Sequence, residues 1–283
     1  MRKFKQDEIE FIKECIKNHI PKNRIVKDVL HICPTHFKRL CKENGIDYPN
    51  FRKNKIWDNP FLDVNSPQVQ YWLGWLATDG HISQSDKKCS LYLQERDIDV
   101  IEKFNLFLGG KLTIHKILHH KKYYQVGLKF RNMEIVSFLG SLGYNEQKTF
   151  NFYPNFKISW DYIRGCFEGD GYLRWGNTCE FNIVGASEKH MNLIYNFLIN
   201  EGFDVLWNLK TKSHKNPVYV VALHKKKQII QLLNKLYTNA DTFMNRKYLL
   251  ARSISNGTWK PLKFGEPALG IPSQADNSEG VTT

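Results

Sequence analysis

The sequence predicts an α+β fold in which one αββαββα arrangement occurs twice, preceded by a small all-α unit. Two observations predict the duplication: an apolar segment ending in Asp-Gly occurs at residues 72–80 and again at 162–171, and similar elements follow each copy. The interval of about ninety residues is too long for a solenoid repeat and fits a duplicated domain. A third observation, apolar residues at helical spacing before residue 50, predicts the all-α unit.

The apolar segment of each copy is expected to form a helix of about three turns with an Asp in its last turn. Ser66 and Pro67 supply a cap and a first-turn proline for the first helix, and Ser159 is suited to cap the second. Gly80 and Gly171 stand where each helix ends, and we expect both in the left-handed conformation. Either Asp-Gly pair alone would be an ordinary helix stop and turn, but the two together indicate a site built from two carboxylates.

Small residues on the two predicted helices favour close packing between them. Gly74, Ala77 and Gly165 leave little bulk on one stripe, so the two backbones can approach closely. Asp79 and Asp170 would then meet at the negative ends of two helices, which is unfavourable unless cations compensate. Because carboxylate and carbonyl oxygens suit hard divalent ions, we expect the two Asp residues to bind Mg²⁺.

The segments that follow each motif predict matching strands and helices. In the first half we expect strands at 81–83, 89–94, 111–117 and 123–130, with helices at 97–108 and 133–142. In the second half we expect strands at 172–175, 180–184, 206–212 and 218–223, with helices at 187–198 and 226–237. Each half therefore reads as a set of antiparallel hairpins backed by helices on one face.

Charge and composition limit the class of partner. The chain has 41 Lys+Arg against 28 Asp+Glu, a formal net charge of +13 and a pI of about 9.3, which favours a polyanionic partner. No apolar run approaches the length of a membrane-spanning helix, and no signal peptide is evident after the charged amino terminus. The six cysteines include no CxxC pair, so we expect free thiols in a soluble intracellular protein.

The two motifs resemble those of the LAGLIDADG homing endonucleases of the single-chain, two-motif type, over residues 60 to 255. The resemblance implies saddle-like antiparallel sheets and a monomer that cuts both strands of a long, asymmetric DNA target with Mg²⁺. It also implies that Asp79 and Asp170 are the metal-binding acids, and that the gene serves intron homing. The first motif departs from the family pattern at Ala77, where an acidic residue is common, whereas the second keeps Glu168.

The same resemblance assigns a role to one lysine after the last helix of each half. Lys148 and Lys247 occupy the place of a basic residue that the family has near its site, thought to stabilise charge or to activate solvent. Positioned cations stabilise the negative charge that develops during phosphodiester hydrolysis, so both are expected to be catalytic. The alternative is two surface lysines in a lysine-rich chain.

Basic and polar residues of the strands and connectors are the expected DNA contacts. Arg131, Arg174 and Gln94 are expected to read bases in the major groove, while lysines contact phosphates and provide most of the affinity. Basic hairpins that are only solvated surface are the alternative. The remaining predicted contacts are Lys111, Lys116, Lys121, Lys122, Lys210, Lys212, Lys215, Arg52 and Lys53.

The first fifty residues predict helices at 6–19, 23–30 and 34–43, of which the last two resemble a helix-turn-helix. Its third helix would enter the major groove. His31 and Cys33 stand where a turn Gly and a capping Ser are usual, and a plain three-helix packing unit is the alternative. The expected DNA-reading side chains are Thr35, His36, Lys38 and Arg39.

The expected domains are a helix-turn-helix-like unit at 1–50, a basic linker at 51–64, the two halves at 65–152 and 153–258, and a disordered tail at 259–283. Two other functions remain open on the same scaffold. One is an intron maturase that binds its host intron RNA, and the other is a non-catalytic DNA-binding regulator. Protein splicing is not expected, because the chain has neither a splicing Cys at its start nor a terminal His-Asn.

Overall fold

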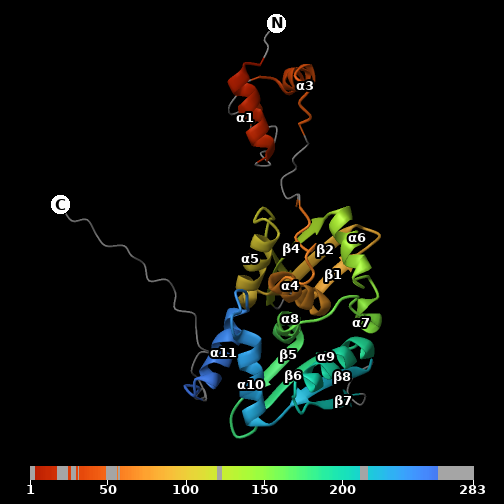
Figure 1. Ribbon diagram of the computed structural model, residues 1–283, viewed down its shortest axis with the longest axis vertical. Coiled ribbons are helices and arrows are strands. Elements are labelled where there is room, and N and C mark those ends of the chain that lie inside the picture. The colour runs from red at the N-terminus through yellow and green to blue at the C-terminus, as the bar shows by residue number, and fades with distance from the viewer. Residues whose placement is uncertain are drawn as a thin grey trace, which may run out of the picture.

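Two antiparallel sheets with the same strand order form the main body of the protein (Figure 1). The computed structural model describes residues 4–17, 25–26, 30, 32–48, 56, 58–119, 123–210 and 216–260. The first sheet has the strand order β1-β2-β4-β3 and the second has the order β5-β6-β8-β7. Neighbouring strands are antiparallel in both sheets, so the predicted α+β class with duplicated sheets is confirmed.

The helices and strands of each half follow the predicted αββαββα order, with one further helix at the end. The first half contains α4 (Pro67–Thr78), β1 (Gly80–Ser83), β2 (Lys88–Gln94), α5 (Ile98–Phe107), β3 (His115–His119), β4 (Tyr123–Arg131), α6 (Met133–Ser141) and α7 (Lys148–Asn151). The second half contains α8 (Trp160–Asp170), β5 (Gly171–Arg174), β6 (Glu180–Gly185), α9 (Glu188–Asn200), β7 (Leu206–Lys210), β8 (Val218–Leu223), α10 (Lys226–Tyr237) and α11 (Asn245–Ser255).

One strand begins later than predicted. Strand β3 starts at His115 and not at residue 111. Leu112 is held instead by α5, because its N–H donates to Asn105 Oδ1 at 3.0 Å and its carbonyl accepts from Asn105 Nδ2 at 2.9 Å. The backbone groups that would pair with β4 are therefore already used.

Helices α4 and α8 lie side by side at the centre of the main body (Figure 1), as the small residues Gly74, Ala77 and Gly165 predict. A Cβ atom on Gly74 would lie 2.3 Å from the carbonyl oxygen of Tyr162, and one on Gly165 would lie 2.2 Å from that of Tyr71. No real Cβ atom approaches another atom this closely, so both positions require glycine. One continuous hydrophobic core extends from these helices into both halves.

The conformation predicted for the glycines after the two motifs is wrong. Gly171 has φ −93° and ψ 156°, which is extended backbone, and Gly80 is not among the glycines with positive φ. Each begins a strand directly, and glycine is required there by space. A Cβ atom would lie 2.7 Å from the Leu76 carbonyl oxygen at position 80 and 2.4 Å from that of Phe167 at position 171.

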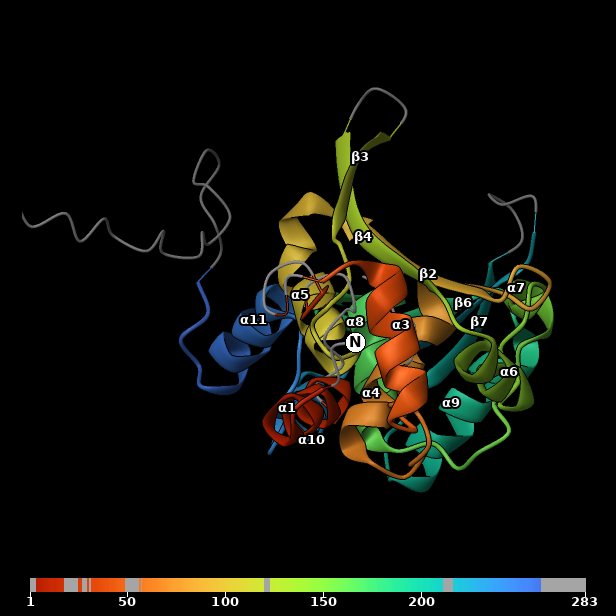
Figure 2. The same cartoon turned by 90° about the horizontal axis from the view of Figure 1, so that it is seen from above.

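The strands of both sheets have one face toward the helices and one open face. Along β2, Cys89, Leu91 and Leu93 are buried on the helix side, and the residues between them face away. In Figure 2 the strands border the upper side of the main body, and most of the helices lie below them. Of the helices in the described part of the chain, none combines the length and the hydrophobicity needed to cross a membrane.

The amino-terminal unit has a hydrophobic cluster of its own, built around Ile12 of α1 (Gln6–Lys17) and Phe37 of α3 (Pro34–Glu43). Cys33 takes the capping place usual for Ser, because its Sγ accepts from the His36 N–H at 3.4 Å. Most of the predicted helix at 23–30 lies outside the described residues, as do His31, residues 51–55 and 57 of the linker, and the tail from residue 261. Trp259, at the start of the predicted tail, packs against the main core.

Candidate active site

The ends of the two motif helices meet and bring two carboxylates together. Asp79 caps the C-terminus of α4, and Asp170 is the last residue of α8. Gly169 marks the contact, because a Cβ atom there would lie 2.8 Å from Asp79 Oδ2 and 2.1 Å from Thr78 Oγ1. Both Asp residues are exposed to solvent. The predicted pairing of the motif ends is therefore present in the fold.

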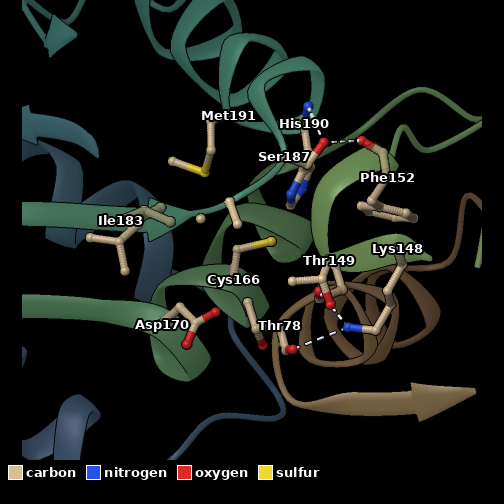
Figure 3. A pocket seen from close by; sticks show the side chains of 14 residues that line it. Thr78, Lys148, Thr149, Phe152, Cys166, Asp170, Ile183, Ser187, His190 and Met191 are labelled. Atoms are coloured by element: carbon tan, nitrogen blue, oxygen red, sulfur yellow. Dashed lines mark hydrogen bonds between the residues drawn. The ribbon is translucent and has the colours of Figure 1, made fainter. Parts of the chain in front are cut away.

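Each helix end carries a lysine on its terminal carbonyl groups. Lys148 Nζ donates to the carbonyl oxygens of Ala77 at 2.9 Å and Thr78 at 3.1 Å, and Figure 3 shows its side chain reaching that turn. Lys247 Nζ donates to the carbonyl oxygens of Phe167 at 2.6 Å and Gly171 at 2.7 Å. A cation is favourable at the negative end of a helix. The two lysines therefore supply the compensating charge that two carboxylates at helix ends require.

The segments that carry these lysines cross from one half to the other. Helix α11 reaches the first half, where the Arg246 guanidinium forms a two-pronged ion pair with Asp97 at 3.0 and 3.2 Å. The end of α7 reaches the second half, where the Ser187 hydroxyl donates to the Phe152 carbonyl oxygen at 2.7 Å. Asp97 and Ser187 both precede the helix that follows the first hairpin of their half. The two crossings thus reach corresponding places in the two halves and hold them together around the site, one through a side-chain ion pair and the other through a backbone carbonyl.

Partial desolvation shifts the pKa values of all four charged groups. Although solvent reaches both carboxylates, protein surrounds them on most sides, and this, with the charge of Asp170, raises the pKa of Asp79 to about 6. Burial also raises the pKa of Asp170, against the opposing attraction of Lys148 and Lys247. Burial lowers the pKa of Lys247 to about 8 and lowers that of Lys148. The two carboxylates are therefore under electrostatic strain that a bound cation would relieve.

The donor set fits a hard divalent cation. Asp79 and Asp170 offer carboxylate oxygens from two converging helix ends, the ligand chemistry that Mg²⁺ prefers. Within the described parts of the chain, no cluster of three or more His, Cys, Asp or Glu side chains is placed to hold a metal. Mg²⁺ commonly binds through one or two carboxylates and completes its coordination with water and substrate phosphate. Two acids at the motif ends satisfy that pattern.

Glu168, the acid that the second motif keeps, connects α8 to its surroundings. The side chain is 1% exposed, and its Oε2 accepts from the Tyr71 hydroxyl at 2.6 Å and from the Met244 N–H at 2.7 Å. Sequence reasoning did not find these partners, because they lie 97 and 76 residues away along the chain. Glu168 is thus a link between α4, α8 and the start of α11.

Four of the predicted DNA contacts lie on the open sheet faces. Gln94 and Arg131 stand opposite Gln125 and Lys88 on the open face of the first sheet, while Arg174 and Lys210 occupy the open face of the second. All four are exposed. Residues that the same alternation places on these faces but that we did not predict are His81, Lys88, Ser90, Lys129, Tyr172, Asn182 and Asn208.

The remaining predicted contacts are placed differently. Lys116 stands opposite buried Val126, away from the open face, where its Nζ pairs with Glu95 and lies 4.3 Å from the Tyr124 ring centroid. Lys111 is exposed before β3. On α3, Thr35 and Lys38 are exposed and His36 and Arg39 are half-buried, with Arg39 paired to Glu43 at 3.5 Å. The predicted contacts outside the described residues are Lys121, Lys122, Lys212, Lys215, Arg52 and Lys53.

Comparison with known proteins finds similarity among solved structures. Neither a protein-family model nor a curated relative matches the sequence. The I-SmaMI LAGLIDADG homing endonuclease bound to cleaved DNA is similar with a TM-score of 0.47 and 11% identity, over 68% of this chain and 88% of that one. Full-length DUF199/WhiA from Thermatoga maritima gives 0.46 and 12%, over 75% and 65% of the two chains. I-DmoI in complex with DNA and Mn gives 0.42 and 13%, over 60% and 95%.

LAGLIDADG homing endonucleases, the family that the motifs resemble, are thus among the similar solved structures, as the sequence predicted. With identities of 11–13% and TM-scores below 0.5, no property of these proteins is transferred to this chain. What the site does is inferred from the residues of this chain.

Proposed function

We propose that this protein is a site-specific DNA endonuclease that binds duplex DNA on its two open sheet faces and cuts both strands with a divalent metal, Mg²⁺. The observation that supports this most strongly is the convergence of Asp79 and Asp170 at two helix ends, each with its own lysine. Carboxylates at such ends are unfavourable for stability. A protein that only binds DNA gains nothing from them, so their presence favours cleavage over a purely regulatory role.

Asp79 and Asp170 would hold the metal, and the remaining chemistry is divided among the chain's own groups. When bound, the metal would activate water for attack on phosphorus and stabilise the departing 3′ oxygen. An ammonium group has three N–H donors. Lys148 and Lys247 each direct two of them to backbone carbonyls at or just after a helix end, and we assign the third to a phosphate oxygen, where it would stabilise the charge that develops.

Binding would use the charge surplus of the chain. The formal net charge of +13 favours a polyanion, and an antiparallel face lined by polar side chains fits the major groove. We assign base reading to Gln94, Arg131 and Arg174, and phosphate contacts to the lysines of the same faces. We propose that α3 forms a second contact, with Thr35, His36, Lys38 and Arg39 toward DNA. Because one monomer carries both half-sites, the target need not be symmetric.

A selection experiment tests this function, and it requires no target sequence to be chosen in advance. The full chain is incubated with a library of randomised duplex DNA in the presence of Mg²⁺, and the cut molecules are recovered and sequenced. We expect one long, asymmetric consensus from the wild-type protein and none with a chelator or from the Asp79→Asn/Asp170→Asn double variant. Asp86→Asn, at an exposed turn residue, is the matched control and should cut as the wild type does.

The same preparation separates the alternatives. Specific retention of DNA without cutting in Mg²⁺ would contradict the endonuclease and indicate a regulator. Preferential binding of structured intron RNA over duplex DNA would indicate a maturase.

A further inference from the structure

The two halves differ at one position of the motif, and this difference changes how each lysine is held. Ala77 and Glu168 are equivalent residues, because each precedes its metal-binding Asp by two positions. Tyr71 and Tyr162 are likewise equivalent, eight positions before Asp79 and Asp170.

In the second half the acid fixes the helix that carries the lysine. Glu168 Oε2 accepts from the Tyr71 hydroxyl at 2.6 Å and from the N–H of Met244 at 2.7 Å. Met244 is the N-cap of α11, and Lys247 follows three residues later, 8% exposed. The carboxylate therefore anchors the first turn of α11 and with it the ammonium of Lys247.

In the first half Ala77 supplies no such anchor. The segment before Lys148 is held instead by exposed Glu146, whose Oε1 accepts from the Ser85 N–H at 3.2 Å, and a cavity lies in this region. The cavity has a volume of about 90 Å³. The side chains of Lys148 and Asp170 are among those that line it (Figure 3). Ala77 lines the cavity and cannot supply a carboxylate. The Tyr162 hydroxyl, equivalent to the one that binds Glu168, is bonded instead to His190 Nε2 at 2.7 Å. Lys148 begins a helix of four residues, whereas α11 has 11.

We propose that Glu168 is a positioning residue for Lys247 and that Ala77 leaves Lys148 less firmly held, so that the two strands of the target are cut at unequal rates. A charged group stabilises a transition state only as well as its position is fixed beforehand. The strand next to Lys247 is therefore cut first, and a nicked duplex accumulates. This inference rests on the proposed endonuclease activity.

Strand-specific rates test the proposal. A duplex target from the selection is labelled differently on its two strands, and Lys247→Ala and Lys148→Ala first identify the strand that each lysine serves. In the wild type we expect the Lys247 strand to be cut several-fold faster. Glu168→Ala should slow that strand by about tenfold and the other by less than about twofold, because only one lysine loses its anchor.

Two tyrosine variants form a matched pair that changes less of the core. Tyr71→Phe removes the hydroxyl bonded to Glu168 and should reduce the rate of the Lys247 strand selectively. Tyr162→Phe removes the hydroxyl bonded to His190 and should leave the ratio of the two rates as it is. This pair keeps the proposal testable if Glu168→Ala does not fold.

Ala77→Glu places a carboxylate at the cavity and should raise the rate of the slower strand toward that of the faster one, so that less nicked duplex accumulates. Equal strand rates in the wild type, or equal slowing of both strands by Glu168→Ala and by Tyr71→Phe, would overturn the inference while leaving the endonuclease intact. Absence of cutting on either strand by the wild type would instead contradict the proposed function.

Discussion

The helix ends at the site and the open sheet faces hold their charges in opposite ways. At the helix ends, protein surrounds Asp79 and Asp170 on most sides although solvent reaches both, their pKa values are raised, and each lysine is bonded to specific carbonyl groups. On the open faces, charged side chains such as Lys129 and Arg131 are exposed to solvent. In the proposed endonuclease, cleavage would therefore depend on a few groups held against an electrostatic cost, whereas DNA binding would be spread over many groups that cost little. Loss of one group should therefore be severe in the first region and graded in the second.

The largest expected effect comes from a single carboxylate at the helix ends. Asp79→Asn or Asp170→Asn should each reduce the rate of double-strand cleavage by about a thousandfold or more, because each removes a charged metal ligand. DNA affinity, measured by fluorescence anisotropy with labelled target, should change by less than about threefold, because neither residue is assigned a phosphate contact. Full activity in either variant would show that the site is misassigned.

The close contact between the motif helices should be nearly as intolerant of change, but through folding. Gly74→Ala places a methyl group 2.3 Å from the Tyr162 carbonyl oxygen, so the two backbones must separate. We expect a loss of about 1–3 kcal/mol in the free energy of unfolding, measured by urea titration. Gly185→Ala at the end of β6 is the control: its new methyl group meets the Sδ of Met191 at 2.8 Å, on a flexible side chain that can change rotamer, so the loss should be smaller. Equal losses would mean that the helix contact is not tight.

Titration of the two carboxylates should give a pH dependence of stability with a definite sign. The pKa of Asp79 is raised from 3.8 to about 6 in the folded protein, so between these values the folded state binds more protons than the unfolded state. This contribution to stability is present at low pH and is lost as pH rises through about 6. The thermal unfolding temperature without metal should therefore rise in Asp79→Asn relative to the wild type at pH 7.5, and the difference should narrow near pH 5.

Added Mg²⁺ should reduce or reverse the difference in thermal unfolding temperature between Asp79→Asn and the wild type. If Mg²⁺ binds the paired carboxylates of the folded state, as we propose, it should stabilise the wild type more than Asp79→Asn at pH 7.5. At limiting Mg²⁺, cleavage should fall as pH drops through about 6 and below, because protons then compete with the ion for Asp79, and added Mg²⁺ should shift that fall to lower pH. A wild type that is not stabilised by Mg²⁺ would contradict metal binding by this pair.

The fold was predictable because apolar periodicity and turn residues specify it locally. The helices Pro34–Glu43 and Lys226–Tyr237 and the strand Val218–Leu223 begin and end where the sequence predicts. The exceptions have specific causes. Strand β3 starts late because the Asn105 side chain hydrogen-bonds to the backbone N–H and carbonyl of Leu112. Gly80 is extended because a strand begins directly after the motif.

The site was predictable only where it repeats. Asp79 and Asp170 are visible because the motif occurs twice, but the bonds of Lys148 and Lys247 to helix carbonyls depend on how α7 and α11 cross between the halves. Spacing along the chain carries no signal for such crossings, and the two lysines were found through the family resemblance. The hydrogen bonds of Glu168 with Tyr71 and Met244 are likewise tertiary contacts, and no local sequence pattern predicts them.

The smallest expected effects belong to single residues of the open faces, where phosphate contact and base reading separate. Neutralising phosphates releases counterions, so log affinity should fall linearly with log salt, with a slope of about −0.9 for each phosphate contacted. Lys129→Ala, at an exposed position on the open face of β4, should reduce that slope by about one phosphate without changing the preferred sequence. Arg131→Ala, two residues along on the same face, should relax preference at one base pair by about 1–3 kcal/mol and leave the slope nearly unchanged. Lys116→Ala, on the other side of the sheet, should do neither, because its ammonium is paired with Glu95. If Lys116→Ala changed the slope as much as Lys129→Ala, the surface in contact with DNA would not be confined to the open face, and the proposed division between a catalytic region and a binding face would be wrong.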